Sequence, residues 1–196
     1  MNAAPIRVLV VDDHVIVRKG TRAFLEEIDG VEVVGDTGSG YEAIQLVESL
    51  HPDVILMDLI MPEMNGVQAI QQIVSQNQDV RIMILTSFIA EDKLLSALKA
   101  GAHNYLMKDS PPEDLVCKIK DTFHGKADLH HSLAHKVQNC FNAAQNVQLL
   151  TSDESEVLQL LNVGLTATQA AQKMCISEAE LHRHIFQIFQ KLHQLP

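Results

Sequence analysis

Short apolar segments alternate with amphipathic ones along the first 127 residues of the chain. The apolar segments are rich in Val and Ile, as in strands that are covered on both faces of a sheet. They fall at residues 6–11, 31–35, 54–57, 80–85 and 105–107. Between them, apolar residues recur at the three- and four-residue spacing of helices. Five strand–helix units in series predict an α/β fold, a doubly wound parallel sheet with strand order 2-1-3-4-5 and helices on both faces.

The pattern after residue 127 is helical only. A polar stretch at 128–147 contains one amphipathic helix, marked by Leu129, Leu133, Val137 and Phe141, and we predict a partly helical linker there. Three helical segments follow, and Ser177 is placed to cap the last. They fall at 153–163, 168–174 and 178–192. This succession is typical of a helix-turn-helix unit. The predicted domains are therefore 1–127, the linker 128–147, and a small all-α domain at 148–196.

The charge of the chain is acidic and unevenly spread. The formal net charge is -10; residues 1–127 hold 19 acidic and 11 basic residues, and residues 128–196 hold 6 and 4. Neither part has the basic footprint expected of a nucleic-acid binder. No apolar stretch approaches the roughly 20 residues of a membrane helix. The three cysteines are scattered without a C-x-x-C pair. We therefore expect a cytoplasmic protein with free thiols and no membrane partner.

Reactive side chains stand where four of the predicted strands end. Asp12 and Asp13 follow the first strand, Asp58 the third, Thr86 the fourth and Lys108 the fifth. These strands are neighbours in the predicted order, so their carboxyl ends bring the side chains together. A single Asp after a strand is more often a helix cap or turn residue. The joint placement of these residue types favours an acidic pocket.

The chemistry of such a pocket points to phosphoryl transfer. Clustered carboxylates repel one another, and a hard divalent cation such as Mg²⁺ removes the conflict because it prefers oxygen ligands. Lys108 offers a compact positive charge, and Thr86 a hydroxyl, to a phosphoryl oxygen. Asp58 is then the natural nucleophile, since a carboxylate can form an aspartyl phosphate.

The first 127 residues resemble the receiver domain of two-component response regulators, which has a flavodoxin-like sheet. The matching motifs are VVDDH at 10–14, DLIMPEMNG at 58–66, LTS at 85–87 and GAHNYLMK at 101–108. The resemblance implies that Asp58 accepts phosphate from a histidine kinase. It also implies that Mg²⁺ is held by Asp12, Asp13, Asp58 and the backbone carbonyl of Ile60. Thr86 and Tyr105 are implied as a switch pair.

The switch has a physical rationale of its own. A phosphoryl group adds charge and strong acceptor oxygens, and Thr86 gains a hydrogen bond to it only by moving. That movement vacates space into which the Tyr105 ring can pack, which would bias a two-state surface. The alternative for Tyr105 is an ordinary half-buried strand aromatic.

Residues 149–195 resemble the helix-turn-helix domain of the LuxR/NarL class of regulators. The retained pieces include LT at 150–151, EVL at 156–158, GLT at 164–166, ISE at 176–178 and KL at 191–192. The class implies DNA binding, usually as a dimer, with 178–192 as the recognition helix. We expect a homodimer in at least one phosphorylation state. The candidate DNA contacts are Lys173, His182, Arg183 and His184.

Two hypotheses remain open for this domain. Glu180 and His182 stand where the class usually has Thr and Lys, near the start of the recognition helix. A carboxylate there would face phosphates of like sign. The retained framework favours a transcription regulator that binds DNA weakly. The net charge of the region instead favours a module that has lost DNA binding and contacts protein.

An enzymatic function is the third possibility. Phosphatases and phosphotransferases with an Asp nucleophile usually carry a second Asp two residues later, and Ile60 stands there. We therefore expect no enzymatic activity beyond Mg²⁺-dependent self-phosphorylation and self-dephosphorylation.

Overall fold

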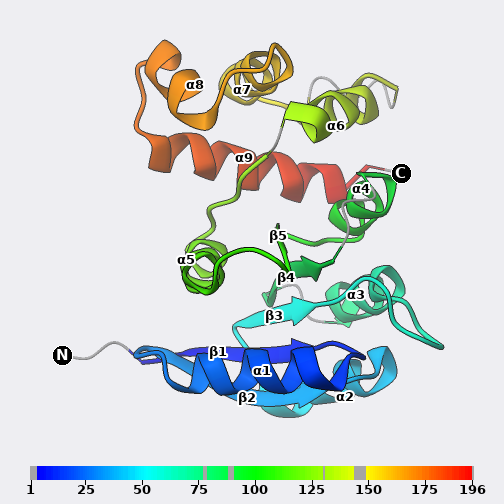
Figure 1. Cartoon of the computed structure of the whole chain (residues 1–196). Helices are drawn as coiled ribbons and strands as arrows, with labels where there is room; N and C mark the ends of the chain where they lie inside the picture. Colours follow the sequence, from blue (N-terminus) through cyan, green and yellow to red (C-terminus); the bar gives the residue numbers. More distant parts are fainter. Residues whose placement is uncertain (1–3, 77–78, 88–90, 130, 144–148, 196) are drawn as a thin grey trace.

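The computed structural model describes residues 4–76, 79–87, 91–129, 131–143 and 149–195. Its first part is a five-stranded parallel sheet in the order β2-β1-β3-β4-β5, as predicted (Figure 1). The strands are β1 (Ile6–Val11), β2 (Val31–Thr37), β3 (Val54–Met57), β4 (Arg81–Thr86) and β5 (Asn104–Met107). β3 is buried at every position, as expected for a strand covered on both faces.

Five helices cover the two faces of this sheet. They are α1 (Val15–Glu26), α2 (Gly40–Leu50), α3 (Gly66–Gln76), α4 (Glu91–Lys99) and α5 (Pro112–Phe123). Side chains of α1 and α5 pack with one set of strand residues, and those of α2, α3 and α4 pack with the other set. Alternate residues of each strand therefore enter two separate apolar cores, as the pleat of a sheet requires.

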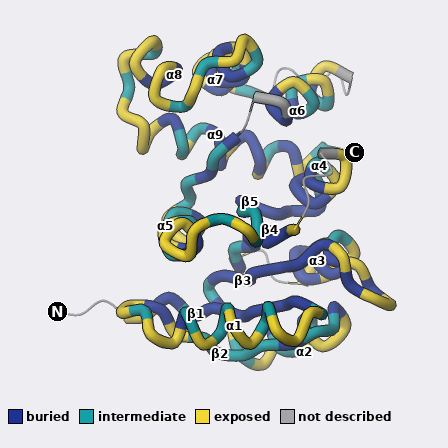
Figure 2. Tube along the Cα trace, in the orientation of Figure 1, coloured by how far each residue is buried: buried dark blue, intermediate teal, exposed yellow. Residues whose placement is uncertain are grey.

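Four further helices form a layer beside the edge strand β5 (Figure 1). They are α6 (His131–Ala143), α7 (Ser152–Asn162), α8 (Ala167–Met174) and α9 (Glu178–His193). α9 lies between β5 and the other three, and buried residues recur along it among exposed ones (Figure 2). A helix beside an edge strand limits the pairing of that edge with another chain.

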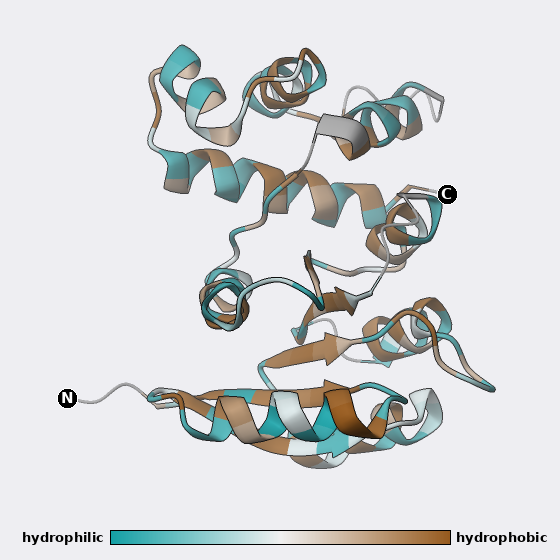
Figure 3. Ribbon diagram, in the orientation of Figure 1, coloured by the Kyte–Doolittle hydropathy of each residue, from teal (hydrophilic) through white to brown (hydrophobic). Residues whose placement is uncertain are grey.

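The segment predicted as a linker contributes to this helical layer. Leu133, Val137 and Phe141 of α6 are fully buried and join the apolar core of α7 and α9. Figure 3 shows the apolar sides of these helices turned toward each other. The predicted boundaries at 127 and 147 remain a prediction, but α6 packs as part of a folded core.

Each helix of the helix-turn-helix region begins with a capping box. Thr151, Thr166 and Ser177 accept a hydrogen bond from the backbone three residues later, and the acidic or amide side chain there reaches back. These reciprocal bonds satisfy backbone N–H groups that a helix start leaves unpaired. In the described part of the chain, every helix is too short or too polar to cross a membrane.

Candidate functional site

The predicted acidic residues meet at the carboxyl ends of β1 and β3. Backbone hydrogen bonds place them there: the Asp58 N–H donates to the Val11 carbonyl at 2.9 Å, and the Asp12 N–H donates to that of Thr37 at 3.0 Å. One ligand atom from each of Asp12, Asp13, His14 and Asp58 lies within 4.8 Å of the others. Parallel strands thus deliver carboxylates to one point, as their spacing in the sequence predicted.

Lys108 lies between two of these carboxylates. Its Nζ is 2.6 Å from Asp12 Oδ2 and 2.7 Å from Asp58 Oδ2, and its side chain is only 8% exposed. Burial alone would lower the pKa of Lys108, but hydrogen bonds to both carboxylates outweigh burial, and the pKa is raised. The lysine is therefore a permanent cation in the pocket.

The loop after β3 folds tightly beneath Asp58, and Gly66 makes this possible. A Cβ added at Gly66 would come within 2.1 Å of the Asp58 carbonyl oxygen, so no other residue fits without moving the loop. Ile60, predicted to offer its carbonyl, lies on this loop, and its N–H donates to Asp58 Oδ1 at 3.2 Å. Its side chain is half exposed.

Two residues near the pocket were not assigned a role from the sequence. The Arg18 guanidinium donates to the Asp12 backbone carbonyl at 2.5 Å and to Asp36 at 3.1 Å, which fixes the turn that carries the acidic pair. His14 Nδ1 lies 2.8 Å from Asp13 Oδ1. His14 is also the N-cap of α1. Nothing in their spacing alone distinguishes these side chains from ordinary helix residues.

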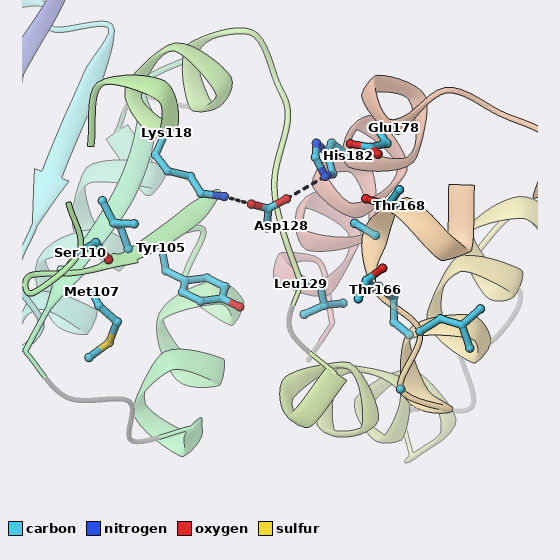
Figure 4. Close-up of a pocket in the computed structure, with 15 residues that line it drawn as sticks. Tyr105, Met107, Ser110, Lys118, Asp128, Leu129, Thr166, Thr168, Glu178 and His182 are labelled. Atoms are coloured by element: carbon cyan, nitrogen blue, oxygen red, sulfur yellow. Dashed lines mark ion pairs between the residues drawn. The ribbon is translucent and has the colours of Figure 1, made fainter. Parts of the chain in front are cut away.

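Thr86 and Tyr105 lie on the adjacent strands β4 and β5. Thr86 is buried as the last residue of β4, and its carbonyl accepts a hydrogen bond from the Lys108 N–H at 2.8 Å. Tyr105 is partly buried and lines a cavity of about 620 Å³ between the sheet and α7–α9. Figure 4 shows its ring beside Leu129 and Asp128 at the wall of this cavity.

The four candidate DNA contacts are in unlike surroundings. Lys173 and Arg183 are exposed. His182 is partly buried, and its Nε2 lies 2.9 Å from Asp128 Oδ1; Asp128 also pairs with Lys118 of α5 (Figure 4). His184 is partly buried, with Nδ1 shielded from solvent. The structure therefore separates two exposed cations from two histidines that face protein.

Comparison with known proteins identifies both parts of the chain. Residues 8–120 match the response regulator receiver domain, and residues 148–194 match the luxR family of bacterial regulatory proteins. The transcriptional regulatory protein LiaR of Bacillus subtilis is 38% identical over 191 residues, which are 95% of this chain and 90% of LiaR.

Two solved structures are also similar. A LuxR-family response regulator from Aurantimonas sp. SI85-9A1 is 35% identical with a TM-score of 0.61, covering 64% of this chain and 90% of that one. RcsB of Salmonella typhimurium is 26% identical with a TM-score of 0.60, covering 97% and 93%. The chain belongs to the response regulators with a receiver domain and a luxR-type helix-turn-helix domain, a family of phosphorylation-controlled transcription regulators.

Proposed function

We propose that Asp58 is the phosphoacceptor of this protein, that Mg²⁺ binds beside it, and that a histidine kinase is the donor. The observation that carries this proposal is the convergence of three carboxylates and Lys108 at the carboxyl ends of the strands. Mg²⁺ prefers oxygen ligands, and the carboxylates of Asp12, Asp13 and Asp58 provide them. Among the residues that the structure describes, Asp13 Oδ1 is buried without a hydrogen-bond partner and lies 2.8 Å from His14 Nδ1, so the pocket retains a carboxylate oxygen for a cation.

The acidic and basic side chains of the pocket have different roles in phosphoryl transfer. Asp12, Asp13 and Asp58, with the Ile60 carbonyl, would hold the metal, which neutralises charge on a phosphoryl group when bound. One carboxylate oxygen of Asp58 attacks phosphorus and forms an O–P bond, while the P–N bond to the kinase histidine breaks and its electron pair returns to the histidine ring nitrogen. Lys108 stabilises the negative charge on the transferred oxygens. The hydroxyl of Thr86 then donates a hydrogen bond to a phosphoryl oxygen.

Phosphorylation would act on α9 through Tyr105. The ring borders the cavity whose opposite wall includes Asp128 and His182, so its inward rotation would remove support from this contact. We propose that the described arrangement is the resting state, in which the receiver holds α9 away from DNA. RcsB is described as having conformational dynamism for DNA interaction, which supports such a rearrangement.

The test of the phosphoacceptor is labelling of full-length protein by acetyl phosphate with Mg²⁺. We expect wild type and the exposed-carboxylate control Asp109→Ala to take up label, and Asp58→Ala to take up none. Label on Asp58→Ala at the wild-type level would overturn the assignment. Omission of Mg²⁺ should abolish labelling of wild type.

A second candidate function rests on the charge of the helical domain. Of the Lys and Arg side chains in α7–α9, Lys191 is bound to the buried Glu154, which leaves only Lys173 and Arg183 exposed. Such a domain has little capacity to release counterions from DNA, and a protein-binding output would suit it. A steep loss of DNA affinity with rising salt supports DNA contact; absence of binding at low salt favours protein contact. The prediction of a homodimer in at least one phosphorylation state remains a proposal, as does the absence of enzymatic activity beyond Mg²⁺-dependent self-phosphorylation and self-dephosphorylation.

A further inference from the structure

One histidine lies against the acidic pocket. A ligand atom of His14 is within 4.8 Å of ligand atoms from Asp12, Asp13 and Asp58, and among the residues that the structure describes it is the histidine that joins such a group. Mg²⁺ prefers oxygen ligands, so the proposed phosphoryl transfer does not explain a ring nitrogen at this place. Imidazole is instead a preferred ligand of transition metal ions such as Zn²⁺.

Two other histidines with buried or half-buried rings have different surroundings. His103 stacks on Phe186 of α9, with ring centroids 5.2 Å apart and an interplanar angle of 28°. His182, also on α9, pairs with Asp128. Both contacts join the receiver to α9, and neither ring meets more than one carboxylate in the ion pairs of the described residues. The three carboxylates around His14 therefore set it apart.

The position of His14 in the sequence usually has a structural role. His14 is the N-cap of α1, where Ser, Thr, Asp and Asn are preferred because their side chains accept a hydrogen bond from the first turn. The His14 side chain makes no such bond. Its backbone N–H donates to Asp12 Oδ1 at 2.9 Å, and this short turn brings the ring back to the acidic pair. The ring therefore has no capping role and lies beside the pocket.

The distances around the His14 ring match those between ligands of one metal ion. Its Nδ1 lies 2.8 Å from Asp13 Oδ1 and 3.5 Å from Asp12 Oδ1. Metal–ligand bonds of roughly 2.0–2.2 Å put neighbouring ligand atoms about 2.8–3.6 Å apart in octahedral or tetrahedral geometry. Asp13 Oδ1 is buried and has no hydrogen-bond partner among the described residues, so this oxygen is available to a cation.

The charge of the pocket suits a divalent cation. Its three carboxylates face the single positive charge of Lys108, whose Nζ lies 2.6 Å from Asp12 and 2.7 Å from Asp58. Buried charges are stable only when they are paired or bind a metal, and one divalent cation compensates the negative charge that Lys108 leaves. A neutral imidazole adds a ligand without changing this balance.

We propose that His14 and the three carboxylates of the pocket bind Zn²⁺, and that Zn²⁺ bound in this way prevents phosphorylation of Asp58. This rests on the proposed function, because it requires that Asp58 is the phosphoacceptor. Four protein ligands complete the tetrahedral shell of Zn²⁺ and leave no position for a phosphoryl oxygen. Mg²⁺ is octahedral and keeps several waters, which a phosphoryl oxygen can replace. The pocket thus distinguishes two divalent cations through one ring nitrogen.

The first experiment measures metal binding to full-length protein without a phosphoryl donor. A chromophoric chelator competes for Zn²⁺, and calorimetry measures Mg²⁺ binding. His14→Ala removes no capping bond, so the variant should fold as wild type. It should lower Zn²⁺ affinity by at least roughly tenfold, since even a residue that only orients a metal ligand is worth about 10- to 100-fold. Mg²⁺ affinity should change far less, because Mg²⁺ prefers oxygen. His124→Ala, an exposed histidine at the end of α5, is the matched control and should bind both ions as wild type.

The second experiment measures labelling by acetyl phosphate at saturating Mg²⁺, with each protein compared to itself before and after Zn²⁺ is added. Zn²⁺ should suppress the label on wild type and on His124→Ala, and His14→Ala should resist this suppression. The cysteines and the remaining histidines are the same in wild type and His14→Ala, so Zn²⁺ bound by them does not contribute to the difference.

The possible failures are distinguishable. Equal Zn²⁺ affinity for wild type and His14→Ala would overturn the proposal and leave His14 as an ion-pair partner of Asp13. Unchanged Zn²⁺ affinity in Asp58→Ala would also overturn it, because the ion would then lie outside the pocket. Full labelling of Zn²⁺-bound wild type would contradict the inhibition. If wild type takes no label with Mg²⁺ alone, the proposed function fails, and the affinities still decide whether the Zn²⁺ site exists.

Discussion

The pocket around Asp58 and the contact around Phe186 are equally well buried but are built on opposite principles. In the pocket, Lys108 is 8% exposed and is held by two carboxylates. In the contact, His103 is also 8% exposed, but no described carboxylate is bound to it. Its Nδ1 accepts a hydrogen bond from the Ile82 N–H at 3.2 Å, which fixes that nitrogen as unprotonated.

This difference shows how each region can respond to a signal. In a closed pocket, opposite charges are little screened by water, so their interaction stays strong. Such a pocket responds directly to an added charged group, here a phosphoryl group. The aromatic contact contains the Arg81 guanidinium 5.2 Å from the centroid of the Phe186 ring but no described ion pair of its own. Its strength comes mainly from buried apolar area and this cation–π contact, so it responds less directly to an added phosphoryl charge. The chain therefore joins a charge-sensitive input to a contact that can be released as a unit.

Removal of the cation from the pocket should have the largest effect. We expect Lys108→Met to reduce the rate of labelling by acetyl phosphate by roughly a thousandfold, about 4 kcal/mol, because the developing phosphoryl charge loses its fixed counter-charge. The measurement is single-turnover labelling at saturating Mg²⁺. Lys120→Met, an exposed lysine on α5, is the control. Equal rates for the two variants would show that the lysine acts only on structure.

The helical layer α6–α9 also contains a buried ion pair, between Glu154 and Lys191, so charge is not confined to the pocket of the receiver. Glu154 is 1% exposed, and both its oxygens lie within 2.7 Å of Lys191 Nζ. Glu154→Ala leaves this lysine unpaired and removes a capping bond to the Thr151 N–H, at a cost of about 3 kcal/mol. Denaturant unfolding of the full chain measures it, against exposed Glu156→Ala. A loss below about 1 kcal/mol would mean that Lys191 reaches water freely.

The fold and the pocket were predictable because their signals are local and unusual. Apolar strands at regular intervals fix the sheet, and the joint placement of residues such as Asp58 and Lys108 at several strand ends, unlike a single Asp after one strand, marks a site. The supporting residues were not predictable in the same way. Arg18 donates a hydrogen bond to the carbonyl of Asp12, six residues earlier in the chain. An arginine at this position of a helix is equally typical of an exposed helix surface, so the sequence does not mark it.

The contact of α9 with the receiver could not be predicted from the sequence. The periodicity of α9 predicts one buried side. The sequence does not predict that Phe186, on another side, is also buried, because its partner His103 lies in the receiver. His103 is 83 residues from Phe186 in the chain. It directly precedes β5, a position where any residue type is common. The capping role of Glu180 was not predicted either: its carboxylate accepts hydrogen bonds from the Ser177 N–H and hydroxyl at 2.9 and 2.8 Å, and its effect on DNA stays a prediction.

Acid should weaken the α9 contact through His103. Burial first, and the charges of Arg81 and His193 next, lower the pKa of His103 to about 3. In an open state the ring is solvated with an ordinary pKa near 6.5. The neutral ring stabilises the closed state fully above about pH 6.5, and this stability is lost as pH falls toward 3, by about 1.4 kcal/mol per unit. Energy transfer between dyes on α1 and α7 should report opening.

A variant that cannot be protonated separates this effect from general acid unfolding. His103→Gln keeps an acceptor for the Ile82 N–H, and its opening should depend much less on pH in the range of histidine titration. His182, whose pKa is also lowered by burial, accounts for any remaining dependence. Identical pH profiles for wild type and His103→Gln would show that His103 does not carry the acid sensitivity of the contact.

The smallest expected effect concerns the start of α9. The Ser177 hydroxyl accepts a hydrogen bond from the Glu180 N–H at 3.2 Å, and Ser177→Ala should cost about 1 kcal/mol of unfolding free energy. The same cap lowers the pKa of Glu180, so its contribution is present above the ordinary pKa of a glutamate and is lost as pH falls further. Ser152→Ala, at the first helical position of α7, is the control, since Thr151 caps that helix. Equal losses for the two serines would show that the box does not hold the helix start, and that the Glu180 carboxylate is free to face DNA.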